Sequence, residues 1–422
     1  MNNIGNELYN LVSELFPICR SITGNGVRLT LDILKKHIPI NIHEVPSGTQ
    51  VFDWNVPKEW NIKDAYVLDE TGTKIIDFKL NNLHLVGYSV PKDNEVDLIE
   101  LQKHLYSLPE SPDAIPYITS YYKENWGFCI TDNQRKSLQP GKYRIFIDSS
   151  LTNGSLTYGE IILPGKTKKE ILISTYICHP SLANNELSGP VVITFITKWL
   201  LSIDRKYTYR IIFVPETIGS LTYISKNLYD LKNNVIAGFN VTCIGDNNSY
   251  SYLSSRYGNT YADKVVDNIF KFNCPNYTSY SYLERGSDER QYCSPGIDLP
   301  VVSVMRTKYG EYPEYHTSLD NLEFISPDGL LGGFNILKKC IEAIEVNDNY
   351  KSTYLGEPQL GKRDLYPNTS SKQTRKEVYN MMNFLAYADG SNDLLDISNL
   401  INVSIDELIP IIITLKENKL IF

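Results

Sequence analysis

Residues able to bind a metal or to move a proton follow short apolar runs in this sequence. Cys178, His179 and Glu186 lie in EILISTYICHPSLANNELSGPVV, residues 170–192, before a second apolar run that begins after Pro190. This pattern predicts a buried strand, a polar loop and the start of a helix. Ligands of open α/β sheets bind beyond the carboxyl ends of the strands. The stretch alone is compatible with a metal or acid–base site, and equally with a histidine satisfied within its own loop.

Three further segments place similar residues near predicted strand ends. Glu216 lies in FVPETIGS, Asp246 in VTCIGDNNS, and His316 with Asp320 in YGEYPEYHTSLDN. A hydrolytic zinc site needs three protein ligands from His, Asp or Glu and an open position for water. It also needs a carboxylate that accepts the water's proton. Together with His179, these residues meet that inventory, although buried carboxylates at strand ends also serve as structural caps.

The elements that must position these residues alternate between strands and helices. Residues 157–346 contain apolar runs that we interpret as five strands, and this alternation predicts a mostly parallel sheet with helices on both faces. Two amphipathic helices are predicted within residues 5–37. The helices expected between and after the strands are 190–202, 219–230, 258–271 and 326–346.

Residues 43–150 differ in character. Short alternating segments bounded by turn residues predict a small antiparallel β domain inserted after the first helices. Its many aromatic residues are expected to fill its own core rather than to form a platform for a ligand. The proline-punctuated stretch 107–129 is expected to fold back toward the main domain. The α/β domain is therefore predicted to be discontinuous, formed by residues 1–42 and 151–346.

A linker is predicted at 347–374, followed at 375–422 by three helices and an edge strand, typical of a winged helix. This module holds four basic residues against seven acidic ones. A surface that binds phosphates needs the opposite balance. We therefore expect no nucleic-acid binding, and a module for packing or for self-association of the chain.

The composition is that of a globular chain with more than one domain. Of 422 residues, 42% are hydrophobic and 21% charged, and the net charge is −8. The sequence contains no apolar run of 18 residues and no basic leader. We therefore expect no membrane span and no signal peptide. The seven cysteines are scattered singly, which favours neither disulfides nor a zinc knuckle and predicts a reducing, cytoplasmic location.

Beyond these patterns, the chain resembles co-catalytic zinc aminopeptidases. It resembles more closely a bacterial family of aminopeptidase-like proteins that carry an inserted β domain and a C-terminal winged helix. The resemblance implies the phosphorylase/hydrolase-like α/β fold, with a mixed sheet covered by helices on both faces. The matching segments are RSITGNGVR, FDWNVPKEW, DAYVLDETG, NLHLVGYS, ICHPSLANNELSG, FVPETIGS, GSDERQYCSPGIDLP and EYPEYHTSLDN.

The resemblance implies a zinc site with one or two ions. His179 and His316 correspond to the first and last metal histidines, Asp246 to the strand-end metal carboxylate, and Glu216 to the acidic pair that supplies the general base.

Two departures reduce the anionic charge of this implied site. Where the resembled enzymes carry the aspartate that bridges two metals, this chain has Asn185, a neutral residue with Glu186 beside it, and the acidic pair is reduced to Pro215-Glu216. Either Glu186 replaces the missing ligand, or the site holds one metal, for example on His179, Glu186 and His316, or it holds none.

Substrate contacts are predicted from five residues around these segments. Arg20 and Arg306 are candidates to hold a substrate carboxylate, Asp288 to receive an α-amino group, and Tyr315 to donate to an oxyanion, with Asn185 beside them. The alternative for each is a structural ion pair, solvation or packing. The leading hypothesis is a zinc exopeptidase or amide hydrolase of a small amino-acid-like substrate. The alternative is a non-catalytic or one-metal binding protein on a peptidase scaffold.

Overall fold

The structure, a computed structural model, describes residues 2–121, 123–366 and 372–422. Its contacts divide the chain into two compact units. The larger unit comprises Met1–Gly258 and Thr278–Phe334, and the smaller unit comprises Asn259–Tyr277 and Asn335–Phe422. All the predicted site residues belong to the larger unit.

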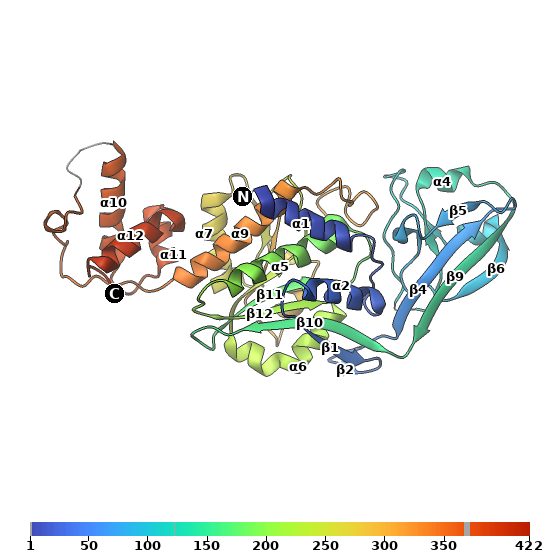
Figure 1. Ribbon diagram of the computed structural model, residues 1–422, viewed down its shortest axis with the longest axis horizontal. Coiled ribbons are helices and arrows are strands. Elements are labelled where there is room, and N and C mark those ends of the chain that lie inside the picture. The colour runs from blue at the N-terminus through green and yellow to red at the C-terminus, as the bar shows by residue number, and fades with distance from the viewer. Residues whose placement is uncertain (1, 122, 367–371) are drawn as a thin grey trace. The chain divides into compact units, whose positions relative to one another are not determined.

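An eight-stranded mixed sheet forms the centre of the larger unit (Figure 1). Its middle strands, β12, β11, β13 and β16, are parallel. At one side β1 and β10 pair antiparallel with their neighbours, and toward the other β14 pairs antiparallel with β16 and parallel with β15. The predicted mixed sheet is therefore confirmed. In spatial order the strands are β1 (Asn41–Pro46), β10 (Ser155–Leu163), β12 (Thr208–Val214), β11 (Glu170–Tyr176), β13 (Val235–Val241), β16 (Val301–Met305), β14 (Ser251–Leu253) and β15 (Thr278–Tyr280).

Helices cover both faces of this sheet because its parallel strands are apolar on both sides. Every residue of β11 is buried. On one face, α6 (Ile218–Asn234) and α8 (Glu289–Tyr292) share a core with Leu172 and Ile212 of the sheet. On the other, α5 (Ser188–Leu201) contacts β11, β13 and α1 (Asn2–Leu15), and α2 (Asn25–Lys35) contacts β10. Figure 1 shows α5 and α6 on opposite sides of the sheet.

The first turn of α5 is pressed against the carboxyl ends of two strands. A Cβ on Gly189 would lie 2.4 Å from the Val241 carbonyl oxygen and 2.5 Å from Thr175 Oγ1. Only glycine fits this approach. The loop that precedes α5 is thereby held over the edge of the sheet where ligands of α/β proteins bind.

The inserted residues form a separate antiparallel sheet with its own core. Trp60, Tyr88 and Trp126 are buried in that core, as expected for aromatic residues of the insert, whereas Trp54 packs against a core cluster of the main sheet. The predicted boundary at residue 43 falls inside β1, which pairs with β10 as far as Pro46. In spatial order the inserted sheet contains β5 (Lys74–Asp77), β4 (Glu59–Leu68), β9 (Lys142–Thr152) and β6 (Lys92–Asp97).

Several shorter elements complete the larger unit. Two small strand pairs lie outside both sheets, and short helices lie between the longer elements. The strand pairs are β2 (Gln50–Val51) with β3 (Trp54–Asn55), and β7 (Leu105–Tyr106) with β8 (Phe128–Cys129). The short helices are η1 (Asn82–His84), α3 (Leu98–Gln102), α4 (Asp132–Ser137), the π-turn η2 (Ala183–Leu187) and η3 (Tyr282–Glu284).

The smaller unit contains the predicted C-terminal helices and part of the predicted linker. Asn402, in the left-handed region at φ 54°, and the capping residue Ser404 form the turn between α11 and α12. The backbone N–H of Lys351 bonds to the carbonyl of Phe422, so the start of the predicted linker pairs with the C-terminal edge segment. Linker residues 367–371 lie outside the described residues. The helices are α7 (Tyr261–Asn273), the second half of α9 (Pro327–Val346), η4 (Gly361–Arg363), α10 (Lys372–Tyr387), α11 (Leu394–Ile401) and α12 (Ile405–Glu417).

A helix that spans a membrane needs about 20 consecutive, mostly apolar residues. In the described part of the chain, no single helix is both long and apolar enough to cross a membrane. The pair α11 and α12, bent by 116° at its break, satisfies the length and composition criteria only when the two helices are taken together.

Candidate active site

The loop after β11 carries the first group of predicted residues. Ile177, Cys178 and His179 follow the strand and are buried, and the loop then enters the π-turn Ala183–Leu187 that runs into α5. The carboxylate of Asp320 accepts the backbone N–H groups of Asn184 at 2.6 Å and of Asn185 at 2.9 Å. Asp320 thus holds the turn that precedes α5, and burial raises its pKa to about 7.

His179 is oriented by a carboxylate behind its ring. Its Nδ1 lies 2.8 Å from Glu186 Oε2, and its Nε2 lies 3.8 Å from Glu216 Oε2 on the other side of the ring. Because a carboxylate accepts, Nδ1 carries the donated hydrogen and Nε2 is the nitrogen available to a metal. Burial opposes a charge on this ring, whereas Cys178, Tyr117 and Glu186 favour it, and the balance holds the pKa of His179 above its ordinary value.

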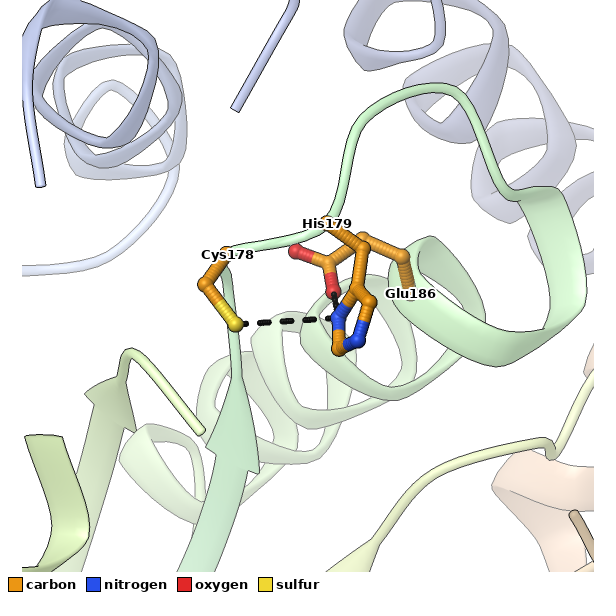
Figure 2. A group of neighbouring side chains, drawn as sticks. All are labelled: Cys178, His179 and Glu186. Atoms are coloured by element: carbon orange, nitrogen blue, oxygen red, sulfur yellow. Dashed lines mark hydrogen bonds and ion pairs between the residues drawn. The ribbon is translucent and has the colours of Figure 1, made fainter. Parts of the chain in front are cut away.

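Figure 2 shows Cys178 and Glu186 approaching the same ring nitrogen of His179. Ligand atoms of these three residues all lie within 4.8 Å of one another, a spacing that could hold a metal. However, the group surrounds the Nδ1 hydrogen, and burial raises the pKa of Cys178 to about 11, so its sulfur remains a neutral thiol. We therefore assign this group to hydrogen bonding that orients His179. Glu186 thus contacts Nδ1 of His179 and not Nε2, the nitrogen available to a metal.

Arg20 is buried behind Glu186, where no substrate carboxylate reaches it. Its side chain is fully shielded from solvent, and its Nε lies 3.5 Å from Glu186 Oε1. The same guanidinium donates to the carbonyl oxygens of His179 at 2.9 Å and Leu15 at 2.9 Å. Burial lowers the pKa of Arg20, and Glu186 acts in the opposite direction. The predicted substrate contact is thus replaced by a chain of contacts from Arg20 through Glu186 to His179.

His316 reaches the same place from a distant loop. The rings of His179 and His316 are tilted with centroids 5.4 Å apart. The Nε2 of His316 is buried and has no hydrogen-bond partner in the described residues. Burial, and then the nearby His179, lower the pKa of His316 to about 3, so its ring is neutral. Its backbone lies in the left-handed region at φ 55°, an uncommon conformation for a residue other than glycine.

Tyr117 links the inserted domain to both histidines, a contact that the sequence did not reveal. Its ring lies 5.0 Å from that of His179 and 5.2 Å from that of His316 between centroids, in a T-shaped arrangement with each. Its backbone N–H donates to the His316 carbonyl at 2.8 Å, and Pro116 pairs with Thr317. The expectation that residues 107–129 fold back toward the main domain is confirmed. No pattern around Tyr117 distinguishes it from the aromatic residues that fill the inserted core.

The carboxylate of Glu216 lies near Nε2 of His179. Its Oε1 accepts a hydrogen bond, and its Oε2 is the oxygen that faces the histidine. Ser287 Oγ donates to Glu216 Oε1 at 2.9 Å, and the backbone N–H of Glu216 contacts Cys178 Sγ at 3.2 Å. Burial raises the pKa of Glu216 above its ordinary value, although His179 acts in the opposite direction. A raised pKa suits a carboxylate that takes and returns a proton. Ser287 lies among charged residues in the GSDERQYC segment, and nothing in the sequence marks its contact with Glu216.

The structure does not bring Asp246 and Arg306 to the histidine pair. Both oxygens of Asp246 accept hydrogen bonds, including the backbone N–H of Thr307 at 3.0 Å and the amide of Asn184 at 3.1 Å. Arg306 donates to the carbonyl of Ser249 at 2.7 Å and lies over the ring of Tyr250. Asp246 therefore joins the loop after β13 to the turn before α5 and to the loop after β16, and Arg306 joins this last loop to Ser249. A carboxylate just after a strand is typical both of a metal ligand and of a structural cap. The sequence therefore did not distinguish these two roles for Asp246.

The remaining predicted substrate contacts differ in their positions. Asp288 Oδ1 accepts the Thr217 backbone N–H at 2.7 Å, and burial followed by the charge on Glu216 raises the pKa of Asp288 to about 8. It therefore supports the turn after Glu216. Tyr315 stacks on His316 with centroids 3.9 Å apart, beside the predicted metal site.

Asn185 occupies the position of the missing bridging aspartate and is buried. Its Nδ2 donates to the Tyr176 hydroxyl at 2.7 Å, while its Oδ1 is buried without a partner in the described residues. An amide oxygen carries no net charge, so this side chain does not supply the anion that two adjacent dications require. The described residues offer a zinc ion two imidazole nitrogens, from His179 and His316, and the nearby carboxylate of Glu216 is suited either to a third ligand or to a base.

Comparison with protein families identifies most of the chain. Residues 9–347 match the family described as a domain of unknown function, DUF4910. The chain belongs to this family. Residues 348–422 match a winged helix-turn-helix family, which confirms the predicted winged helix and places its start within the predicted linker.

Similar proteins support the fold predicted from the sequence. A Clostridium acetobutylicum protein, 50% identical over 396 residues, covers 93% of this chain and 91% of its own length. Its provisional name assigns it to polysaccharide biosynthesis and gives it an aminopeptidase-like domain. A crystal structure from the same organism, provisionally described as a peptidase, is 47% identical and matches 100% of this chain and 97% of its own with a TM-score of 0.94.

A zinc aminopeptidase from Bacillus subtilis shows the same fold at much lower identity. It is 13% identical, with a TM-score of 0.58 over 81% of this chain and 95% of its own. At this identity the likeness concerns the fold alone. The predicted aminopeptidase-like α/β fold is confirmed.

Proposed function

We propose that this DUF4910 protein is a zinc-dependent hydrolase that cleaves an amide bond of a small substrate. The observation that supports this most directly is the pair of neighbouring imidazoles, His179 and His316, with the carboxylate of Glu216 at 3.8 Å from His179 Nε2. In this proposal the Nε2 atoms of the two histidines hold one zinc ion. Glu186 and Arg20 orient His179 from behind.

The chemistry of the chain then centres on Glu216. Zinc, when bound, polarises a scissile carbonyl and lowers the pKa of a water. Glu216 Oε2 accepts the proton of the attacking water and passes it to the leaving amine, while Ser287 keeps Oε1 in place. Tyr117 and Tyr315 flank the histidines and exclude bulk water. A hydroxyl of this pair is the candidate donor to the oxyanion of the substrate.

The relatives indicate a broad class of substrate. The fold supports a peptide or amide substrate, and the name of the Clostridium acetobutylicum relative supports a role in polysaccharide biosynthesis. We propose a small molecule with an amide on an amino acid or an amino sugar as the substrate.

The zinc content of the purified chain tests this proposal. We expect one zinc ion per chain in protein prepared without chelators, and loss of that zinc in His316→Ala, because each histidine supplies one of few ligands. His37→Ala, a change at an exposed histidine, is the matched control and should keep the metal. Metal analysis by mass spectrometry gives the ratio. Absence of zinc both after purification and after adding zinc would contradict the proposal.

A non-catalytic binding protein on the same scaffold is the second candidate. The neutral Asn185 and the fully bonded Asp246 favour it, because both reduce the anionic charge available to a metal. This alternative expects no zinc-dependent hydrolysis of peptides or N-acyl amino sugars. Hydrolysis that is lost with a chelator and restored by zinc would exclude it.

We propose that the winged helix packs or self-associates and does not bind nucleic acid. In α12, Asp406 and Glu407 precede an apolar stripe, whereas a phosphate-facing helix is basic. Ile413 of the same helix and Leu400 of α11 are more than half exposed. We expect the full chain to give no sequence-specific mobility shift with DNA at physiological salt. Ile413→Lys should lower the mass found by light scattering, and a specific DNA complex would contradict the proposal.

A further inference from the structure

A groove rich in arginine lies on the larger unit, outside the histidine site. It has a volume of about 570 Å³, within the size range of small-molecule sites. Its lining includes Arg256, Arg285 and Arg290, together with Tyr282, Gln291 and Ser294. Its lining residues include no carboxylate. The groove therefore carries an excess of positive charge in a chain whose net charge is negative.

The three guanidinium groups differ in how far other groups neutralise them. Arg256 pairs with Asp298 at 3.1 Å and donates to the Tyr257 hydroxyl at 2.5 Å. Arg285 is exposed, lies over the Tyr282 ring and donates only to a backbone carbonyl. Within the described residues, neither Arg285 nor Arg290 lies in an ion pair with a carboxylate. The charge of Arg285 is thus available to an anion, whereas the charge of Arg290 also lowers the pKa of the buried carboxyls of Glu216 and Asp288.

Arg290 connects the groove with the turn that carries Glu216. Its Nη2 donates to Thr217 Oγ1 at 2.6 Å, and Thr217 directly follows Glu216 in the chain. Its Nε is buried without a hydrogen-bond partner in the described part of the chain. Buried donors are rarely left unpaired, so this N–H indicates a missing acceptor. Ser287, which donates to Glu216, lies three residues before Arg290.

We infer that this groove binds a phosphate or diphosphate group of the substrate. Guanidinium groups bind phosphate oxygens through paired, charge-assisted hydrogen bonds. Arg285, together with Arg256 and Arg290 whose charges are partly neutralised, matches the charge of a phosphate better than that of one carboxylate. The inference rests on the proposed function, since the anion belongs to the molecule whose amide is cleaved at Glu216. A phosphorylated amide substrate held by Arg285 and Arg290 would be anchored beside the turn of the general base.

Binding of inorganic phosphate to the full chain, measured by calorimetry, tests the inference. We expect one site in the unmodified chain and at least about tenfold weaker binding in Arg285→Gln and Arg290→Gln. Arg144→Gln, at an exposed arginine of β9, is the matched control and should leave the affinity unchanged. Acetate, as a probe with one carboxylate, should bind more weakly than phosphate. Arg285→Gln keeps the test valid if Arg290→Gln disturbs folding, because Arg285 is exposed.

His316→Ala separates this inference from the proposed zinc site. Phosphate should bind that variant as it binds the unmodified chain, because His316 is not among the groove residues. Phosphate binding that is equal in the unmodified chain and Arg285→Gln would overturn the inference, as would tighter binding of acetate. A phosphate Kd above about 1 mM in the unmodified chain would also overturn it, even if zinc-dependent hydrolysis is found.

Discussion

Glu216→Gln is expected to abolish hydrolysis while leaving the zinc content unchanged. Loss of a general base lowers kcat by about 100-fold to 10,000-fold. The amide of Gln can still accept the hydrogen bond from Ser287, so the local structure should persist. Zinc should remain because His179 and His316, which we propose as its ligands, are unchanged. Turnover with the substrate found in a screen of amides, together with metal analysis of the same sample, measures both quantities.

Matched controls make this result specific. Glu124→Gln, at an exposed glutamate of the inserted domain, should leave both turnover and zinc unchanged. Unchanged turnover in Glu216→Gln would remove Glu216 from the mechanism. Loss of zinc in the same variant would instead make Glu216 the third protein ligand, a role that its 3.8 Å distance from His179 Nε2 also permits.

Arg20→Met is expected to lower the free energy of unfolding by about 3–5 kcal/mol, the cost of leaving one member of a buried ion pair without its partner. Both side chains of the Arg20–Glu186 pair are fully shielded from solvent. The change also removes the donors to the carbonyls of Leu15 and His179. Unfolding in urea, followed by tryptophan fluorescence, reports on the larger unit because all four tryptophans lie in it.

Two further variants separate the buried charge from general packing. Arg144→Met breaks an exposed pair with Asp93, so a loss of less than about 1 kcal/mol is expected. Arg20→Met combined with Glu186→Leu should recover part of the lost stability, because no unpaired charge remains buried. A loss below about 1 kcal/mol in Arg20→Met alone would refute the importance of the pair.

The strand–loop–helix unit around His179 was predictable from the sequence because its signals are local. The apolar run of β11 and the start of α5 at Ser188-Gly189-Pro190 are read from neighbouring residues. The scarcity of histidine also helped, since six histidines in the chain leave few candidates for nitrogen ligands. His179 and His316 could therefore be nominated together, but the sequence does not show that their rings meet.

The roles of the carboxylates could not be assigned before the fold was known. Glu186 and Glu216 both lie in polar loops after strands, and the sequence offers the same chemistry for each. In the structure, one faces Nδ1 and the other faces Nε2 of the same ring. That difference depends on the direction of a single imidazole, which is determined by packing among residues from several segments.

By itself, the sequence determined the α/β fold class, the inserted β domain, the winged helix and the two histidines, because periodicity and residue type act over short stretches of chain. Only the tertiary structure decided that Arg20 supports Glu186 from within the core, that Tyr117 of the inserted domain touches both histidines, and that Asp246 links its loop to Thr307. These contacts join residues that are up to 199 positions apart, as Tyr117 and His316 are. A local sequence pattern does not show which distant residues meet in the fold.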